Sequence, residues 1–494
     1  MEKVSLWFQP GDRREGFRWQ SSYQNIAVGL CNRPFCQVCN LPEREKLRGF
    51  SGGRIEVQLT LHRRPSFWEE RQFYLGHLVR SLPKVKAVDE GIEYDVSKFN
   101  AFLYLTSKGG ILVDPGVMGF DEEKNPLLQL IANRRVVATI ITHGHQDHWN
   151  NLSVLRANSP IFLPSLAFQL ASRHASLGRD FHLLRLLDRA KRVVPGEPIL
   201  FEQNLPLQID TISLPHSIPE TVGLIIRGEK RRVVHLADFK FNGMEARTKA
   251  ATIAQFSEIA REKVDLLVVN IINAHIPGFT PLEALVIETL TDIIARAKKR
   301  VIITCFSTNL ERIRRIAEVA QLLDRPVQFF GAGMQNSKEL LRIENGEGDL
   351  DQAVVFVTGC QAEEESILWR IAQGENPLFE LRPDDILVAS ARCVPGKEES
   401  LCQQYLALRP KVERVIVNEG EVEQLGLGDL DFEEALIHVS GHESREGLRL
   451  ALEILQPKSV LPWPQTSPQF EAFREIAEPL GVEILDEKER VVKV

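Results

Sequence analysis

Short β-branched runs alternate with amphipathic stretches along most of the chain. Residues 136–141 are all β-branched apart from one alanine, which predicts a buried strand. Residues 280–299 begin with Thr280 as the expected helix N-cap, Pro281 in the first turn and Glu283 completing a capping box. Repetition of such units predicts an α/β fold. The apolar residues of the expected helix recur at helical spacing, at Leu282, Leu285, Val286, Leu290 and Ile293.

The same pattern divides the chain into parts. Residues 1–75 hold eleven of the aromatic residues and three of the seven cysteines, which predicts a small separate module. Further along, strand, polar turn and helix repeat in a way that predicts an inserted domain with a parallel sheet. The expected order is a module at 1–75, a first domain segment at 76–275, the insertion at 276–390 and a returning segment at 391–494.

Composition and charge exclude several classes of protein. A chain of 494 residues with 44% hydrophobic residues can fill several cores, which excludes an intrinsically disordered chain. The formal net charge of −7 provides no overall basic field, so we expect any polyanion site to be local. No apolar run is long enough to span a bilayer, no secretory signal pattern opens the chain, and the cysteine count is odd. These features predict a cytoplasmic protein with no membrane partner.

A cluster of metal-ligand residues follows the expected strand at 136–141. The loop has the pattern H-x-H-x-D-H, formed by His143, His145, Asp147 and His148. The first two histidines can point the same way, while the aspartate and the third histidine reach a second point nearby. This arrangement predicts two adjacent metal ions. Nitrogen and carboxylate ligands without a thiolate favour Zn²⁺, with Mn²⁺ or iron as alternatives. The competing interpretation is a polar turn that is rich in histidine by chance.

Further ligand candidates follow other strand-like runs. Asp114 follows GGILV, His216 stands in DTISLPHSIPET, and Asp238 follows RRVVHLA. Together with the H-x-H-x-D-H loop, their order along the chain resembles that of the metallo-β-lactamase fold. The resemblance implies an αββα sandwich with a metal centre at one edge.

After Asp238 the resemblance becomes more specific. The segments NAHIPGFTPLE, CFSTNLERIRR, VTGCQAEEE, VPGKEE and HVSGHESREGL occur in the order found in ribonuclease J and its β-CASP relatives. The resemblance covers residues 75–494 and implies a metallo-β-lactamase sandwich interrupted by a β-CASP domain. It also implies a hydrolase that cleaves RNA phosphodiesters with a metal-activated water, with single-stranded DNA as an alternative partner.

The resemblance implies six metal ligands in two groups that share a carboxylate. Three histidines hold one ion, an aspartate and a histidine hold the other, and a further aspartate bridges the two ions. These are, respectively, His143, His145 and His216, then Asp147 and His148, and finally Asp238.

Other roles follow from the same resemblance. Asp114 orients a ligand histidine. His442 of HVSGH donates a proton to the leaving group, while His438 and Ser440 bind the substrate phosphate. Asp147, Asp114 and His442 are therefore the residues expected to act in catalysis.

Two positions depart from the family pattern. Pro464 stands where ribonuclease J has a further histidine ligand, and proline has no donor atom. Asn270 replaces an acidic residue expected to support the catalytic histidine, and a neutral amide cannot stabilise an imidazolium by charge. His275 lies in the same segment, where a substitute ligand and a structural role are the alternatives. The sequence therefore leaves open whether the centre holds one ion or two.

Residues 1–75 carry a second candidate site. Cys31, Cys36 and Cys39 have the C-x4-C-x2-C spacing of plant-type iron–sulfur proteins, which also require a fourth cysteine. His62, or a residue from another domain, could instead complete a zinc site. Three unligated thiols are the remaining alternative.

Three functional hypotheses follow from these observations. The first is a metal-dependent ribonuclease of the β-CASP type. The second is an RNA-binding protein of the same fold whose turnover has been weakened by the changes at Asn270 and Pro464. The third is a redox-linked enzyme of this fold that uses an iron–sulfur or zinc site at the N-terminal cysteines. The oligomeric state is not specified by the sequence.

Overall fold

The computed structural model describes the chain from Asn100 onwards, within the compact unit Ile92–Val494. The expected N-terminal module, including its candidate site at Cys31, Cys36 and Cys39, lies outside the described residues. The described ranges are 100–116, 126–131, 134–156, 160–245, 247–375, 379–428, 430–486 and 489–494.

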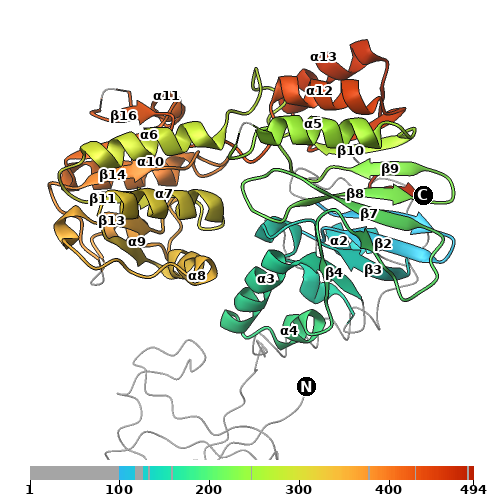
Figure 1. Cartoon of the computed structure of the whole chain (residues 1–494), viewed down its shortest axis with the longest axis horizontal. Coiled ribbons are helices and arrows are strands. Elements are labelled where there is room, and N and C mark those ends of the chain that lie inside the picture. The colour runs from blue at the N-terminus through green and yellow to red at the C-terminus, as the bar shows by residue number, and fades with distance from the viewer. Residues whose placement is uncertain are drawn as a thin grey trace, which may run out of the picture. The chain divides into compact units, whose positions relative to one another are not determined.

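Two sheets pack face to face at the centre of a sandwich (Figure 1). The first contains β1 (Phe102–Thr106), β2 (Gly109–Val113), β3 (Val136–Ile140), β4 (Ile161–Pro164), β5 (Lys191–Val193) and β19 (Val491–Lys493). The second contains β6 (Pro198–Ile199), β7 (Gln208–Ser213), β8 (Val222–Arg227), β9 (Arg232–His235), β10 (Leu266–Asn270), β17 (Ser459–Trp463) and β18 (Glu483–Ile484). Their orders are β19-β1-β2-β3-β4-β5 and β18-β17-β10-β9-β8-β7-β6. Buried apolar residues from both sheets form one core between them, because each strand turns alternate side chains inward.

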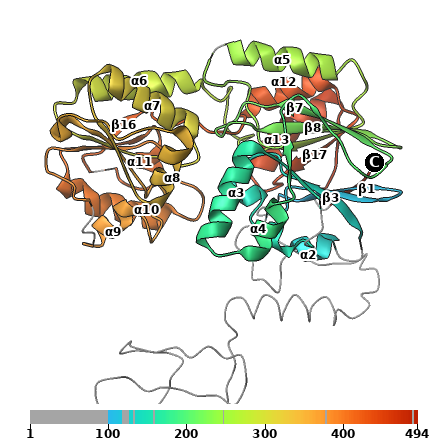
Figure 2. The ribbon, with the colours of Figure 1, turned by 60° about the horizontal axis from the view of Figure 1, so that its bottom comes forward.

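Helices cover the outer face of each sheet (Figures 1 and 2). Apolar residues of the helices near the first sheet form one core with its outer side, and those near the second sheet form another. The predicted αββα sandwich is therefore confirmed. None of the helices in the described ranges combines the length and the apolar character needed to cross a bilayer. The helices are α2 (Pro126–Ile131), α3 (Ser165–Leu177) and α4 (Phe181–Leu187) on the first sheet, and α5 (Arg247–Ile259), α12 (Arg445–Leu455) and α13 (Gln469–Ala477) on the second.

A third sheet forms the inserted body, and every neighbouring pair of its strands is parallel. Its strands are β11 (Val301–Thr304), β12 (Val327–Phe330), β13 (Val354–Val357), β14 (Ile386–Ala389), β15 (Arg414–Asn418) and β16 (Glu433–Ala435). They lie in the order β12-β13-β11-β14-β15-β16. One face packs against α6 (Glu283–Arg296), α7 (Leu310–Leu322) and α8 (Ala332–Leu341), and the other against α9 (Ile367–Ala372), α10 (Glu398–Leu408) and α11 (Glu421–Gln424). The predicted parallel sheet in the insertion is therefore confirmed.

The end of the inserted body differs from the expected boundary at residue 390. Strands β15 and β16 pair with the same sheet beyond that residue. Ile437 and Val439 still belong to its core, whereas Leu448 packs in the sandwich. The returning segment therefore begins near residue 440. The sequence pattern did not reveal this boundary because strand, turn and helix continue without a change of composition.

The start of α6 also differs from the expected capping box. The helix begins at Glu283, and the preceding residue makes no side-chain capping bond. Glu283 is buried and accepts a hydrogen bond from the guanidinium of Arg312, 29 residues further along the chain. A buried Arg without its carboxylate partner would cost more than the roughly 1 kcal/mol of a cap, so the tertiary ion pair prevails.

A polar group lies within the apolar layer of the sandwich. His235 of β9 is fully buried, and its Nδ1 contacts the hydroxyl of Tyr104 at 2.7 Å. Its ring stacks on Trp463, and its Nε2 has no hydrogen-bond partner. Burial lowers the pKa of His235 to about 3. Between about pH 6.5 and 3 the folded protein therefore keeps this ring neutral, whereas the unfolded chain protonates it.

We expect acid to weaken the fold through His235. Between pH 6.5 and 3 the unfolded chain binds a proton at this ring and the folded chain does not, so stability falls as pH falls. The loss attributable to this group is about 2 kcal/mol at pH 5. Urea unfolding of wild type and His235→Gln at pH 7 and 5 measures it, because the variant lacks the titrating ring. An equal pH dependence in both proteins would contradict this expectation.

Candidate metal centre

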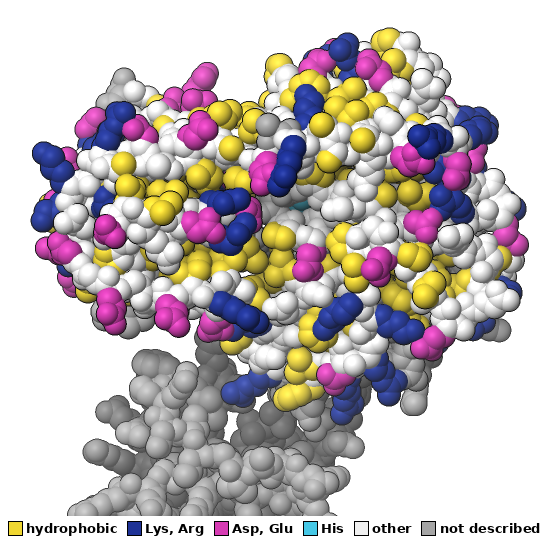
Figure 3. Space-filling view, viewed as in Figure 1, with side chains coloured by type: hydrophobic (Ala, Val, Ile, Leu, Met, Phe, Trp, Pro, Cys, Tyr) yellow, Lys and Arg dark blue, Asp and Glu magenta, His cyan; other side chains and the backbone are white. Residues whose placement is uncertain are grey.

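Loops that leave three strands bring the predicted ligands together. His143, His145 and His148 lie on the loop after β3, and His216 follows β7. Asp238 comes three residues after the end of β9. In the space-filling view a histidine side chain is visible in the hollow where the sandwich meets the inserted body, with basic and acidic side chains around it (Figure 3). The sequence thus folds these separate segments into one site.

Three imidazoles and one carboxylate form a group suited to a metal ion. Nδ1 of His145 lies 3.2 Å from Nε2 of His143 and 3.1 Å from Nε2 of His216. Oδ2 of Asp238 lies 3.6 and 3.8 Å from the same two Nε2 atoms. All four ligand atoms lie within 4.8 Å of one another. Ligands at about 2.1 Å from a tetrahedral ion lie about 3.4 Å apart, so the group fits a divalent cation such as Zn²⁺.

The far nitrogens of two of these rings are held by the protein. Nδ1 of His143 lies 3.0 Å from the hydroxyl of Thr142. Nδ1 of His216 donates to the carbonyl of Gly441 at 2.7 Å, which leaves Nε2 as the lone-pair nitrogen facing the site. Such contacts fix the ring orientation and the tautomer that a metal ion requires. The ligand group is therefore organised by residues from both ends of the sandwich sequence.

Burial prepares the three histidines to bind a cation. It lowers the pKa of His145 to about 4 and holds the pKa values of His143 and His216 well below the usual histidine value. The rings are therefore neutral at pH 7, and their lone pairs are available without displacement of a proton. This electrostatic state is what a metal ligand set needs.

A second group shares Asp238. Nε2 of His148 lies 3.2 Å from Oδ2 of Asp238 and 3.6 Å from Oδ2 of Asp147, and this buried nitrogen makes no well-aligned hydrogen bond. Burial lowers the pKa of His148, but the carboxylates of Asp238, Asp147 and Asp114 outweigh that effect and raise it well above the usual value. An ion here would therefore displace a proton. The three donors fit a second cation with fewer protein ligands than the first.

Asp114 lies behind this second group. Its Oδ2 accepts hydrogen bonds from Nδ1 of His148 at 2.9 Å and from the hydroxyl of Thr142 at 2.6 Å, and its Oδ1 accepts from the backbone N–H of Thr142. The carboxylate is buried and all its contacts lie within the protein. Asp114 thus holds the orientation of the His148 ring.

Asn100 is a site residue that sequence reasoning missed. Its side-chain amide donates to both the carbonyl and Oδ2 of Asp147, each at 3.1 Å, and its oxygen accepts from Nε1 of Trp463 at 3.4 Å. Asp147 is 42% exposed on its side chain, and it contacts His148 as well as Asn100. No local pattern marks Asn100, because its partners are 47 and 363 residues away in the chain.

The structure shows where the two departures from the family pattern, Asn270 and Pro464, lie. Asn270 ends β10 and donates to Oδ1 of Asp238 at 2.8 Å, so it supports the shared carboxylate and not His442. Nδ1 of His442 lies 3.8 Å from the same oxygen. Pro464 directly follows β17 and adds no ligand atom. His275 is exposed and lies outside the metal-ligand group found among the described residues.

The residues expected at the substrate phosphate are already engaged by the protein. Nδ1 of His438 lies 2.8 Å from a guanidinium nitrogen of Arg312. The hydroxyl of Ser440 accepts from the side chain of Asn273 at 2.8 Å and from the backbone N–H of His442 at 3.1 Å. A serine hydroxyl has two lone pairs and one hydrogen, so its hydrogen stays available to donate to an acceptor outside the protein.

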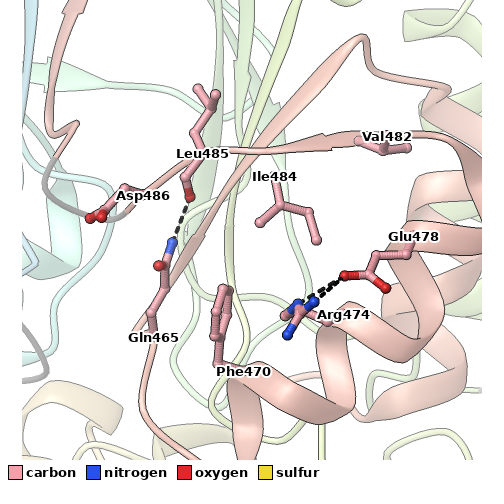
Figure 4. Close-up of a pocket in the computed structure, with 8 residues that line it drawn as sticks. All are labelled: Gln465, Phe470, Arg474, Glu478, Val482, Ile484, Leu485 and Asp486. Atoms are coloured by element: carbon pink, nitrogen blue, oxygen red, sulfur yellow. Dashed lines mark hydrogen bonds and ion pairs between the residues drawn. The ribbon is translucent and has the colours of Figure 1, made fainter.

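Another hollow lies between α13 and β18 and contains none of the predicted site residues (Figure 4). Phe470 forms part of its wall. Its polar side chains pair with the protein, since Arg474 bonds Glu478 and the amide of Gln465 donates to the carbonyl of Leu485 at 2.7 Å. This hollow therefore offers no chemistry related to the metal centre.

The fold and the histidine centre define a metallo-β-lactamase-fold protein with an inserted body. Family models agree, since residues 110–295 match the beta-lactamase superfamily domain and residues 298–406 match the beta-CASP domain of ribonuclease J. The chain belongs to the β-CASP group of metallo-β-lactamase-fold proteins and resembles ribonuclease J.

Individual relatives support this assignment. The chain is 30% identical to ribonuclease J of Sinorhizobium meliloti over 67% of its own length and 57% of the relative. It is 28% identical to ribonuclease J of Thermus thermophilus over 72% of its length and 64% of that relative. It therefore spans about three fifths of these relatives. A crystal structure of a protein of unknown function from Enterococcus faecalis V583 shares the fold at 14% identity, with a TM-score of 0.52 over 79% of this chain and 95% of that one.

Proposed function

We propose that the protein is a metal-dependent ribonuclease that hydrolyses RNA phosphodiester bonds. The observation that carries the proposal is the group of His143, His145, His216 and Asp238, whose ligand atoms converge within 4.8 Å beside the inserted body. The relatives named ribonuclease J supply the substrate class. Zn²⁺ suits the nitrogen and oxygen donors best, with Mn²⁺ or iron as alternatives.

In this proposal each side chain has a distinct task. Bound divalent ions would activate a water for attack at phosphorus and neutralise the phosphoryl oxygens. Asp238 is shared between the two ligand groups, and although burial raises its pKa, His442 and His148 hold that pKa well below the usual value. The carboxylate therefore stays ionised. Asp147 completes the second group, and Asp114 holds the orientation of the His148 ring.

Residues 438–442 would bind the scissile phosphate and protonate the leaving group of the RNA. His442 lies beside Asp238 and is one-quarter exposed on its side chain, so it can pass a proton to a leaving oxygen. Ser440 donates its free hydroxyl hydrogen to a phosphate oxygen. His438 is hydrogen-bonded to Arg312 and lies on the buried side of this pocket.

Pro464 favours a second candidate, an RNA-binding protein with weak turnover. The second ligand group contains only Asp147, His148 and the shared Asp238, so the second ion would bind less tightly than the first. A protein that holds one ion firmly could recognise a phosphate without rapid hydrolysis. The redox hypothesis depends on cysteines outside the described residues and stays a sequence-based prediction.

Cleavage of labelled RNA tests the proposed function. We expect full-length protein with added Mn²⁺ or Zn²⁺ to shorten a 5′-labelled single-stranded RNA, to lose this activity with a chelator and to regain it when metal returns. Single-stranded DNA of the same sequence tests the alternative substrate. Tight RNA binding with no product in either metal would instead identify the weakened RNA-binding protein.

A further inference from the structure

Four charged side chains are buried where the inserted body joins the sandwich. The exposed fractions are 0% for Arg312, 1% for Lys240, 5% for Glu283 and 1% for Glu443. Taking a charge out of water costs several kcal/mol unless it is paired and hydrogen-bonded. Such a group is retained only where its partners satisfy it.

Glu283 joins a cation from each body. It is the first residue of α6 in the inserted body, and its Oε1 accepts from Nε of Arg312 on α7 at 2.5 Å. Its Oε2 lies 3.5 Å from Nζ of Lys240, which follows Asp238 in the sandwich by two residues. Although burial alone would raise it, Arg312 and Lys240 lower the pKa of Glu283 to about 2. The carboxylate is therefore ionised and lies between two basic side chains.

The two cations hold three consecutive residues at the junction between the inserted body and the returning segment. Nη1 of Arg312 donates to Nδ1 of His438 at 2.8 Å, and its Nη2 donates to the carbonyl of Val439 at 3.4 Å. Nζ of Lys240 donates to the carbonyl of Ser440 at 3.0 Å. Burial and the Arg312 cation keep the pKa of His438 well below its usual value, so this ring is a neutral acceptor.

Glu443 fixes the other end of the same segment. Its carboxylate accepts from the backbone N–H groups of Phe241 at 2.5 Å, Thr280 at 3.0 Å and Ser444 at 2.8 Å. The hydroxyl of Thr280 donates to the carbonyl of His442 at 2.6 Å. Residues 438–443 are thus held at both ends by buried charge and carry little freedom of their own.

Between these two ends the segment touches the metal centre. The carbonyl of Gly441 accepts the hydrogen bond from Nδ1 of His216, and a β-carbon at position 441 would lie 2.6 Å from that ring. The next residue, His442, places its ring beside Asp238. A shift of the segment would therefore turn a metal ligand and move the expected proton donor at the same time.

We propose that Arg312, a residue of the inserted body, is a positioning residue for the metal centre. The guanidinium of Arg312 fixes the position of residues 438–440. These residues in turn fix the positions of Gly441 and His442, and the carbonyl of Gly441 fixes the orientation of the His216 ring. The inserted body in this way controls the affinity for the ion as well as the approach of the proton donor. The expected effect on RNA cleavage rests on the proposed ribonuclease function, whereas the expected effect on metal affinity does not.

Arg312→Met tests the proposal, because methionine keeps much of the apolar stem and removes every donor. We expect cobalt(II) to bind the histidine centre about tenfold more weakly, the low end of the loss seen when an outer partner of a metal ligand is removed. Visible absorption reports this binding. Cobalt bound to thiolates is recognised separately, because it shows additional charge-transfer bands. For RNA cleavage we expect kcat to fall with KM nearly unchanged.

Two further variants separate positioning from stability. Arg315→Met, on the same helix but with its side chain 35% exposed in ion pairs with Glu311 and Glu318, should leave cobalt affinity unchanged. Arg312→Met combined with Glu283→Gln preserves the net charge of the cluster, so its Tm should recover relative to Arg312→Met while cobalt affinity stays weak. Where Arg312→Met alone does not fold, this double variant carries the comparison.

The outcomes are distinct. Wild-type cobalt affinity in Arg312→Met, or recovery of both Tm and affinity in the double variant, would overturn the positioning role. Absence of RNA cleavage by the wild-type protein would reject the proposed function, and the cobalt measurement would still decide the role of Arg312.

Discussion

Replacing His145 by alanine is expected to remove one metal ion and to lower RNA cleavage by about three orders of magnitude. Nδ1 of His145 faces Nε2 of both His143 and His216 at about the separation that ligands of one ion require. Without it the first group keeps two imidazoles and a shared carboxylate. Metal ions contribute several kcal/mol to such hydrolysis, and each 1.36 kcal/mol is a factor of ten in rate.

Metal content of the purified protein, measured by plasma mass spectrometry, and cleavage of labelled RNA check this expectation together. His174→Ala provides a matched control, because His174 is an exposed histidine of α3 outside the ligand group. The control should keep its metal and its rate. Unchanged metal content in His145→Ala would show that the ion binds elsewhere, and unchanged cleavage would separate the histidine centre from catalysis.

Asp238→Asn is expected to remove both ions, a larger loss than any single histidine substitution causes. Oδ2 of Asp238 lies 3.2 Å from Nε2 of His148 and 3.6 Å from Nε2 of His143, so the same oxygen serves both groups. Oδ1 accepts from the amide of Asn270. In the variant the oxygen would stay with Asn270 and the NH₂ group would face the histidines, where it cannot ligate a cation.

Metal titration of wild type, Asp238→Asn and Asp147→Ala distinguishes a shared carboxylate from an ordinary ligand. We expect Asp147→Ala to lose only the weaker ion and Asp238→Asn to lose both, with cleavage by the latter about three orders of magnitude below wild type. Asp265→Asn, directly before β10, should match the wild type. One ion retained by Asp238→Asn at wild-type affinity would mean that Asp238 does not bridge the two groups.

The sequence by itself determined the elements and the local part of the centre. Residues 136–141 were expected as a strand and form β3 over Val136–Ile140, because period and β-branching are properties of neighbouring residues. The H-x-H-x-D-H loop follows for the same reason, as its ligands lie within six residues. The repeated units of strand, turn and helix predicted the parallel sheet of the insertion, since each unit carries its own local signal. The sandwich was predicted from the resemblance of the ordered motifs to the metallo-β-lactamase fold.

Only the tertiary structure decided which distant residues complete the site. Asn100 reaches Asp147, Asn270 supports Asp238 in place of His442, and Arg312 holds the segment that touches His216. Glu283 likewise pairs with the distant Arg312 and does not form the expected capping bond. These contacts join residues separated by tens or hundreds of positions, and their strength comes from burial, which a local pattern does not contain. A buried charge requires a partner that only the folded chain can supply.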